Sequence, residues 1–143
     1  MDHTILIVDD EEDIRYALEI YLSHFGYKVL KAENGEEALS LFRVFGPPII
    51  LSDIKMPGID GIELLQKIKQ ENPDTEVIMI TGHGDMDLAI RSIRNDATDF
   101  LLKPINDDAL EIALKRAKDR MSMRQKLKDC EEKLKQLTYL ENP

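Results

Sequence analysis

The chain has 143 residues, enough for one domain of ordinary size, and its 43% hydrophobic and 33% charged residues favour a folded core over disorder. Its formal net charge of −9, with acidic residues spread along the chain, argues against direct binding of nucleic acid. The single cysteine, Cys130, excludes an internal disulfide, and no apolar run resembles a signal peptide or approaches the roughly 20 residues that cross a bilayer, so we expect a cytoplasmic protein without membrane insertion.

The first half of the chain alternates between short apolar runs and amphipathic segments. Residues 4–8 (TILIV) are apolar or β-branched throughout, which is typical of a strand buried on both faces. Apolar residues then recur at helical spacing from about Asp13 until Gly26 ends the helix, and residues 27–30 predict a second strand. Asn34 is a suitable N-cap for a second helix, which ends at the breaker GPP, and residues 49–51 predict a third strand.

The second half continues the same alternation. After the turn PGIDG a third helix runs through Leu64 and Ile68, and residues 77–80 predict a fourth strand. Residues from 85 to about 94 are again helical, and residues 100–102 predict a fifth strand. Five strands that alternate with five helices indicate an α/β fold with a mostly parallel sheet and right-handed crossovers.

The last helix starts near residue 106 or 107 and meets no breaker before residues 142–143. Its first part carries an apolar stripe that can cover the sheet: Leu110, Leu114, Ala117 and Met121. Its second part carries a stripe at alternating steps of four and three, which is a heptad seam: Met123, Leu127, Cys130, Leu134 and Leu137. We therefore expect a domain over residues 1–120 and a helical coiled-coil extension or linker over 121–143; the alternative is a helix end docked on its own domain.

Polar side chains follow four of the five strands. Asp9 and Asp10 follow the first, Asp53 the third, Thr81 the fourth and Lys103 the fifth. Functional residues of such sheets gather beyond the carboxyl ends of the strands. Three carboxylates that converge there need a counter-charge, and an all-oxygen ligand set favours Mg²⁺.

The chemistry of these residues points to phosphoryl transfer. A carboxylate such as Asp53 becomes a useful nucleophile toward phosphorus when Mg²⁺ and Lys103 neutralise the oxygens of the electrophile. The hydroxyl of Thr81 can donate to a phosphoryl oxygen. Each residue alone has a simpler explanation, such as a helix cap, a solvated lysine or a strand-end hydroxyl. Their occurrence at successive strand ends favours a single phospho-acceptor site.

From Thr4 to about Arg116 the chain resembles the receiver domains of two-component response regulators. The matching motifs, in chain order, are ILIVDDEEDIR, LSDIKMPGIDG, VIMITGHGD and DFLLKPI. The resemblance implies a flavodoxin-like (βα)5 three-layer sandwich, with a parallel five-stranded sheet of order 2-1-3-4-5 and here an extended C-terminal helix.

The same resemblance assigns roles at the site. Asp53 is expected to accept the phosphoryl group from a sensor histidine kinase or a phosphotransfer protein. The Mg²⁺ ion is expected to contact Asp53, Asp10 directly, Asp9 through water, and the backbone carbonyl of Lys55. Lys103 is expected to pair with the phosphoryl group.

Further roles concern the response to phosphorylation. Thr81 is expected to move toward the phosphoryl group and Phe100 to act as the switch aromatic, while the Lys103–Pro104 bond is expected to be cis. By position in the family, Lys55 and His83 lie near the path of the attacking water and are hypothesised to tune the phosphoryl lifetime.

Two alternative functions and one possible partner also follow from the sequence. A pseudo-receiver that only binds a partner normally lacks part of the constellation, which is complete here. An aspartate-dependent Mg²⁺ phosphatase of the haloacid dehalogenase type carries a second aspartate two residues after its nucleophile, where this chain has Lys55. We therefore expect a signalling domain and not an enzyme, and a homodimer through the last helix or coiled coil is the self-association that the seam suggests.

Overall fold

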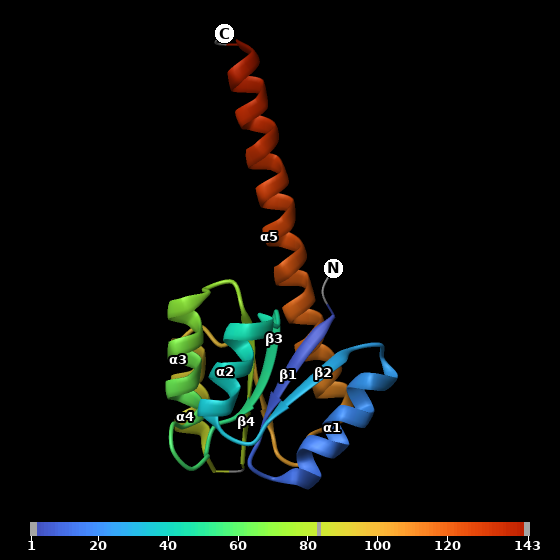
Figure 1. Cartoon of the computed structure of the whole chain (residues 1–143), viewed down its shortest axis with the longest axis vertical. Helices are drawn as coiled ribbons and strands as arrows, with labels where there is room; N and C mark the ends of the chain where they lie inside the picture. Colours follow the sequence, from blue (N-terminus) through green and yellow to red (C-terminus); the bar gives the residue numbers. More distant parts are fainter. Residues whose placement is uncertain (1–2, 83, 142–143) are drawn as a thin grey trace.

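The computed structural model describes residues 3–82 and 84–141, and its strands form one parallel sheet of order β2-β1-β3-β4-β5 (Figure 1). This is the predicted flavodoxin-like order. In chain order the elements are β1 (Thr4–Val8), α1 (Glu12–His24), β2 (Lys28–Ala32), α2 (Gly35–Phe45), β3 (Ile49–Asp53), α3 (Gly61–Glu71), β4 (Glu76–Thr81), α4 (Met86–Arg94), β5 (Asp99–Leu102) and α5 (Asp107–Glu141).

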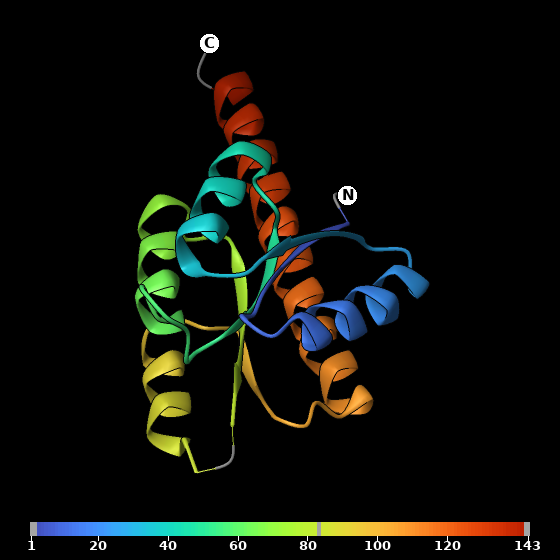
Figure 2. The same cartoon turned by 60° about the horizontal axis from the view of Figure 1, so that its bottom comes forward.

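The sheet is covered on both faces, which produces three layers. Successive side chains of a strand point to opposite faces, so Leu6 and Ile50 lie in the core under α2, α3 and α4. Ile7 and Leu51 lie in the second core, under α1 and α5. Figure 2 shows these two groups of helices on either side of the sheet. The apolar runs in the central strands therefore reflect burial on both faces, as predicted.

The start of α2 and the position of β2 each have a local cause. The side chain of Asn34 accepts a hydrogen bond from the backbone of α2 at 2.8 Å, as a predicted N-cap should. The second strand lies later than predicted, at 28–32 and not 27–30. Tyr27 still donates its backbone N–H to Leu22 in the preceding helix turn. The edge strand β2 then continues through the exposed Lys31, which an apolar run cannot reveal.

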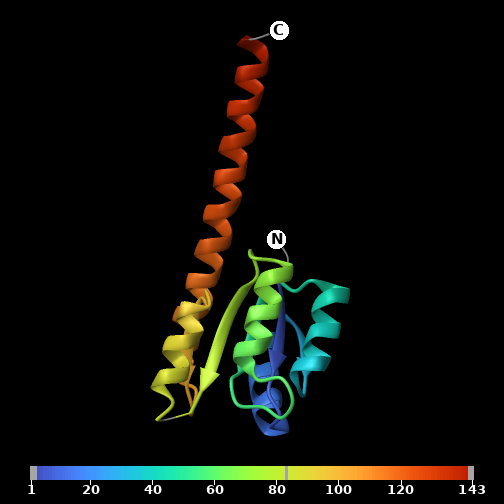
Figure 3. The same cartoon turned by 90° about the vertical axis from the view of Figure 1, so that its left-hand side faces the viewer.

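The last helix is a single element of 35 residues, and its two halves have different surroundings. Leu110, Leu114 and Ala117 are buried against the sheet. Beyond them the seam residues point to solvent: Leu127 is 59% exposed and Leu137 is 56% exposed. The helix projects away from the domain (Figures 1 and 3). A coiled coil or linker over residues 121–143 stays a prediction.

The change of surroundings falls between Met121, which is partly buried, and Met123, within an unbroken helix.

No helix within residues 3–82 and 84–141 combines the length and apolar character needed to cross a membrane.

Candidate functional site

The residues predicted at the strand ends meet at one edge of the sheet. Asp9 follows β1 directly, Asp53 is the last residue of β3, Thr81 is the last residue of β4, and Lys103 follows β5. Because all five strands are parallel, these positions share the carboxyl edge, which lies at the lower end of the sheet in Figure 3, opposite the projecting part of α5.

Three carboxyl groups form the centre of the site. Each of Asp9, Asp10 and Asp53 has a carboxylate oxygen within 4.8 Å of one on the other two. Asp9 and Asp53 are buried, while Asp10 is exposed. An oxygen cluster of this kind suits a hard divalent cation that keeps part of its water shell, so the donor set fits Mg²⁺.

Lys103 supplies the positive charge within the cluster. Its Nζ donates a hydrogen bond to Asp53 Oδ2 at 3.1 Å and lies 3.3 Å from Asp9 Oδ2. The exposed Glu11, which the sequence did not single out, lies 3.8 Å from the same Nζ. The backbone N–H of Lys103 donates to the Thr81 carbonyl, and the Lys103–Pro104 peptide bond is cis, the geometry that the resemblance implied.

Burial and the neighbouring charges shift the pKa values of three groups at the site. Burial raises the pKa of Asp9, against a backbone hydrogen bond from Glu11 and the charge of Lys103. Burial also raises the pKa of Asp53, and the nearby charge of Asp9 adds to this effect. Burial lowers the pKa of Lys103, but the bond and charge of Asp53, followed by Asp9, outweigh it and leave the pKa raised. One lysine therefore compensates the carboxylates only in part.

Two buried oxygen atoms of the site lack a hydrogen bond within the described part of the chain: Asp9 Oδ2 and Thr81 Oγ1. The contact of Asp9 Oδ2 with Lys103 is an ion pair without hydrogen-bond geometry. Asp53 and Thr81 line the same pocket, of about 230 Å³, together with Asp10, Glu11, Lys55, Gly82, Asp85 and Lys103. The pocket thus offers a carboxylate, a hydroxyl and an ammonium group around one space.

An ion pair that the sequence did not predict joins two residues that line this pocket. Lys55 Nζ lies 2.9 Å from Asp85 Oδ1, and the Lys55 side chain is 69% exposed. Asp85 precedes α4 but makes no capping hydrogen bond with its side chain. Phe100 is partly buried and packs against the core under α2, α3 and α4. His83, hypothesised to act on the phosphoryl lifetime, lies outside the described residues.

Comparison with known proteins agrees with this geometry. The family model described as response regulator receiver domain matches residues 5–115. The nitrogen assimilation regulatory protein NtrX of Azorhizobium caulinodans is 39% identical over 140 residues, which is 96% of this chain and 30% of that protein. The DNA-binding transcriptional regulator NtrC of Escherichia coli is 40% identical over 113 residues, or 79% of this chain and 24% of that protein.

Solved structures give the same result. A response regulator receiver domain protein from Clostridium thermocellum superposes with a TM-score of 0.81 at 34% identity, covering 84% of this chain and 97% of that one. NtrX from Brucella abortus superposes with a TM-score of 0.85 at 35% identity, covering 91% of this chain and 30% of that one. The chain thus spans less than a third of the full-length relatives NtrX and NtrC. With its fold, its strand-end residues and these matches in agreement, the chain belongs to the response regulator receiver domain family.

Proposed function

We propose that this domain accepts a phosphoryl group on Asp53 from a phosphohistidine of a sensor histidine kinase or phosphotransfer protein. A carboxylate oxygen of Asp53 would attack phosphorus, forming an O–P bond as the P–N bond breaks and the imidazole leaves. The observation that carries the proposal is the placement of Asp53, buried at the end of β3, hydrogen-bonded to Lys103 and facing a pocket that it shares with Thr81.

The neighbouring residues have distinct roles in this proposal. Asp10 would bind Mg²⁺ directly, Asp9 through water, and the backbone carbonyl of Lys55 would complete the protein ligands with Asp53. The ion would neutralise oxygens of the incoming group. Lys103, already bonded to Asp53, would pair with the phosphoryl oxygens.

The switch would follow from the unbonded hydroxyl of Thr81. Its Oγ1 is buried without a hydrogen bond among the described residues, so a phosphoryl oxygen would give it an acceptor. Movement of Thr81 toward that oxygen would open room for Phe100, which packs only partly buried in the adjacent core. The result would be a signal to an output domain or partner, with self-phosphorylation and autodephosphorylation as the domain's own chemistry.

Two other functions have less support. The phosphatase alternative needs a second carboxylate two residues after the nucleophile, and this position holds Lys55, whose Nζ is paired with Asp85. A pseudo-receiver would lack part of the acceptor constellation, whereas the acidic cluster and Lys103 lie together here.

Intact-mass spectrometry after incubation with acetyl phosphate tests the acceptor site. We expect one phosphoryl adduct that requires Mg²⁺ and is lost in Asp53→Asn. Asp60→Asn is a matched control, because Asp60 is also an aspartate that follows β3 but its side chain caps α3. An adduct that persists in Asp53→Asn would refute the assignment, and no adduct in the unaltered chain would favour a binding module.

The exposed seam of α5 supports a homodimer as one partner arrangement. Leu127 and Cys130 occupy neighbouring seam positions, and Lys126 and Glu131 flank them at the positions that face a partner helix. In a parallel pair Lys126 of one copy lies opposite Glu131 of the other, whereas an antiparallel pair brings like positions together. Charge therefore favours the parallel orientation.

Cys130 provides a test of this pairing. In a parallel, in-register pair the two Cys130 thiols face each other across the seam, so mild oxidation should give a disulfide-linked dimer. Moving the thiol to a position outside the seam, in Cys130→Ala with Asp129→Cys, should abolish the link. Equal cross-linking from both positions would mean random collision, and Leu134→Asp, which places a charge in the seam, should remove the specific product.

A further inference from the structure

A fully buried carboxylate lies at the end of the sheet opposite the acceptor site. Glu76 is the first residue of β4, and its side chain has no exposed surface. Glutamate is rarely buried to this degree unless it is paired, because desolvation of the charge is unfavourable. Its partners therefore reveal what this position does.

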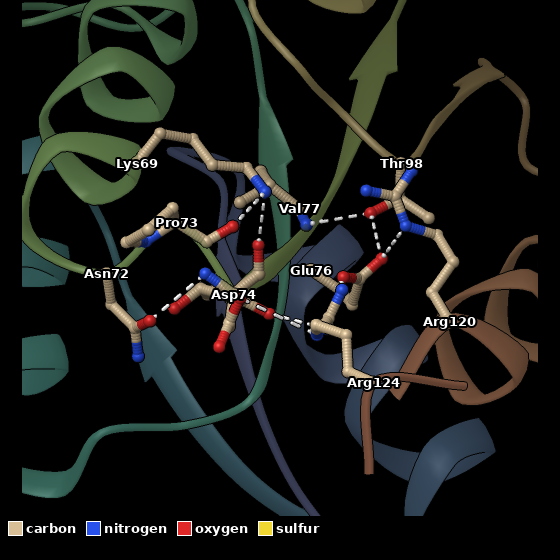
Figure 4. Close-up of polar contacts among 10 residues, drawn as sticks. Lys69, Asn72, Pro73, Asp74, Glu76, Val77, Thr98, Arg120 and Arg124 are labelled. Carbon is tan, nitrogen blue, oxygen red and sulfur yellow. Dashed lines mark hydrogen bonds and ion pairs between the residues drawn. The ribbon is translucent and has the colours of Figure 1, made fainter. Parts of the chain in front are cut away.

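Two of the partners come from α5 and one from the loop before β5. Arg120 Nε lies 2.9 Å from Glu76 Oε1, and Arg124 Nη2 donates to Glu76 Oε2 at 2.6 Å. Thr98 Oγ1 donates to Oε1 at 2.9 Å and accepts a hydrogen bond from the backbone N–H of Val77 (Figure 4). Both carboxylate oxygens are thus bonded, and one of them joins α5 to the β4–β5 pair.

The loop between α3 and β4 belongs to the same cluster. Arg124 Nη2 also donates to the backbone carbonyl of Asp74 at 2.7 Å. From the other side, Lys69 Nζ donates to the carbonyls of Pro73 and Thr75, at 3.1 and 2.7 Å. Figure 4 shows the loop held between Lys69 and Arg124. This loop is therefore fixed by both α3 and α5.

The two arginines lie where α5 passes from its buried part to its exposed part. Ala117 is the last fully buried residue of the helix, and the seam is exposed from Met123 onward. Arg120 and Arg124 are one turn apart and bridge this transition on the face that continues from Ala117. At 100° per residue, the mean direction of the seam is turned roughly 90° away from this face. Two contacts one turn apart constrain both the tilt and the rotation of the helix.

We propose that Glu76 is a positioning residue that anchors α5 where it leaves the domain, and so sets the direction in which the seam is presented. Arg120 and Arg124 act as the two points of attachment, and the helix beyond Arg124 behaves as a rigid extension of the sheet. This role does not depend on phosphorylation of Asp53 or on the occupant of the seam.

The distance between two spin labels on the full chain tests the anchor. One label is placed on the native Cys130 and the other on Gln70→Cys, at an exposed position near the end of α3. Dilution with excess unlabelled Cys130→Ser chain leaves only distances within one molecule. We expect a narrow distance distribution in the otherwise unaltered chain, measured by pulsed electron paramagnetic resonance.

Loss of the anchor should widen this distribution. In Arg120→Ala/Arg124→Ala we expect the width to rise roughly two-fold, because the helix end loses its side-chain attachments to the sheet. The single variant Arg124→Lys keeps Arg120 and retains a cation at position 124, so its distance distribution should stay close to the unaltered width. Lys128→Ala, one turn further along the same face, is the matched control and should leave the width unchanged.

Folding is checked in the same samples, by helical circular dichroism and by the Asp53 adduct from acetyl phosphate. If the double variant is not folded, Arg124→Ala alone provides the comparison. A folded variant that lacks Arg124 but keeps the unaltered width would overturn the proposal, as would equal broadening in Lys128→Ala. If Asp53 does not accept a phosphoryl group even in the unaltered chain, the proposed acceptor function fails but the anchor does not. Circular dichroism alone then serves as the folding check.

Discussion

Replacement of Lys103 by methionine should destabilise the domain in a way that Mg²⁺ largely reverses. Lys103 Nζ is within 3.3 Å of both Asp9 and Asp53, and these two carboxyl groups are buried with little other compensation. Methionine keeps the length and apolar stem of the side chain but removes its charge. In the absence of a metal ion, the variant then holds two buried carboxylates without a cation.

The expected loss follows from the exposure of the groups. Removing one partner of a buried ion pair destabilises by about 3–5 kcal/mol. Lys103 is 21% exposed, so water reaches the site and the lower end, about 3 kcal/mol in EDTA, applies. For a domain of this size that corresponds to roughly 10 °C in the midpoint of thermal unfolding. In saturating Mg²⁺ the ion replaces the missing charge, and we expect a loss of about 1 kcal/mol.

The stability loss in Lys103→Met should depend on pH, and the pKa shifts give the direction. The pKa values of Asp9 and Asp53 are raised in the folded chain, chiefly by burial. A carboxyl group with a raised pKa favours the folded state when protonated, and this contribution is lost as the pH rises through its folded pKa. The effect of Lys103→Met in EDTA should therefore shrink as the pH is lowered from 7, because protonation removes the uncompensated charge.

Thermal unfolding followed by circular dichroism, with EDTA or with Mg²⁺, measures the loss. Lys55→Met is the control: Lys55 also lines the pocket, but it is 69% exposed and its pair with Asp85 should contribute less than about 1 kcal/mol in either buffer. The reasoning fails if Lys103→Met lowers the midpoint equally with and without Mg²⁺, or no more than Lys55→Met does.

Four further substitutions have defined outcomes. Gly61→Ala would place a Cβ against the backbone carbonyl of Asp53, which cannot yield as a side chain can, so urea unfolding should show a loss of about 3 kcal/mol and phosphorylation should slow. Gly46→Ala, at φ of 56°, would bring its added Cβ within 4 Å of no described atom beyond the local backbone, so it should lose only about 1–2 kcal/mol, from backbone strain. Asn34→Ala removes the side-chain cap of α2 and should lower stability by about 1 kcal/mol in the same assay. Lys55→Ala should change the decay rate of the phosphorylated domain, followed by mass spectrometry, and an unchanged rate would remove Lys55 from the tuning of that lifetime.

The convergence of the proposed acceptor residues at one edge of the sheet could be predicted, because these residues stand at recognisable places in the sequence. Asp53, Thr81 and Lys103 each lie at the end of an apolar run, and parallel strands bring such ends to one edge. The contacts that loop side chains make around the site could not be predicted from the order of apolar and polar residues. The approach of Glu11 to Lys103 and the pair between Lys55 and Asp85 depend on the paths of loops, which composition does not determine.

The division of α5 into two stripes was predicted, whereas its anchor was not. Periodicity shows which residues share a face, so the change near Met121 and Met123 was visible in the sequence. Glu76 gives no comparable signal. It stands before an apolar strand, where a charged residue ordinarily marks the solvent-exposed start, and its partners Arg120 and Arg124 follow more than 40 residues later. Only the packing of α5 against β4 and β5 reveals that this charge is buried and paired.

Strand β4 carries both the proposed switch residue and the anchor, at opposite ends. Thr81 is its last residue and Glu76 its first, and the residues between them are fully buried. Close packing leaves such a strand little freedom to deform. A change confined to Thr81 and Phe100 would therefore reach the surface around α4 and β5 more readily than it would swing α5, whose exit is tied to the far end of the same strand. On this argument, phosphorylation would alter which surface a partner meets, while the direction of the seam stays fixed by Glu76.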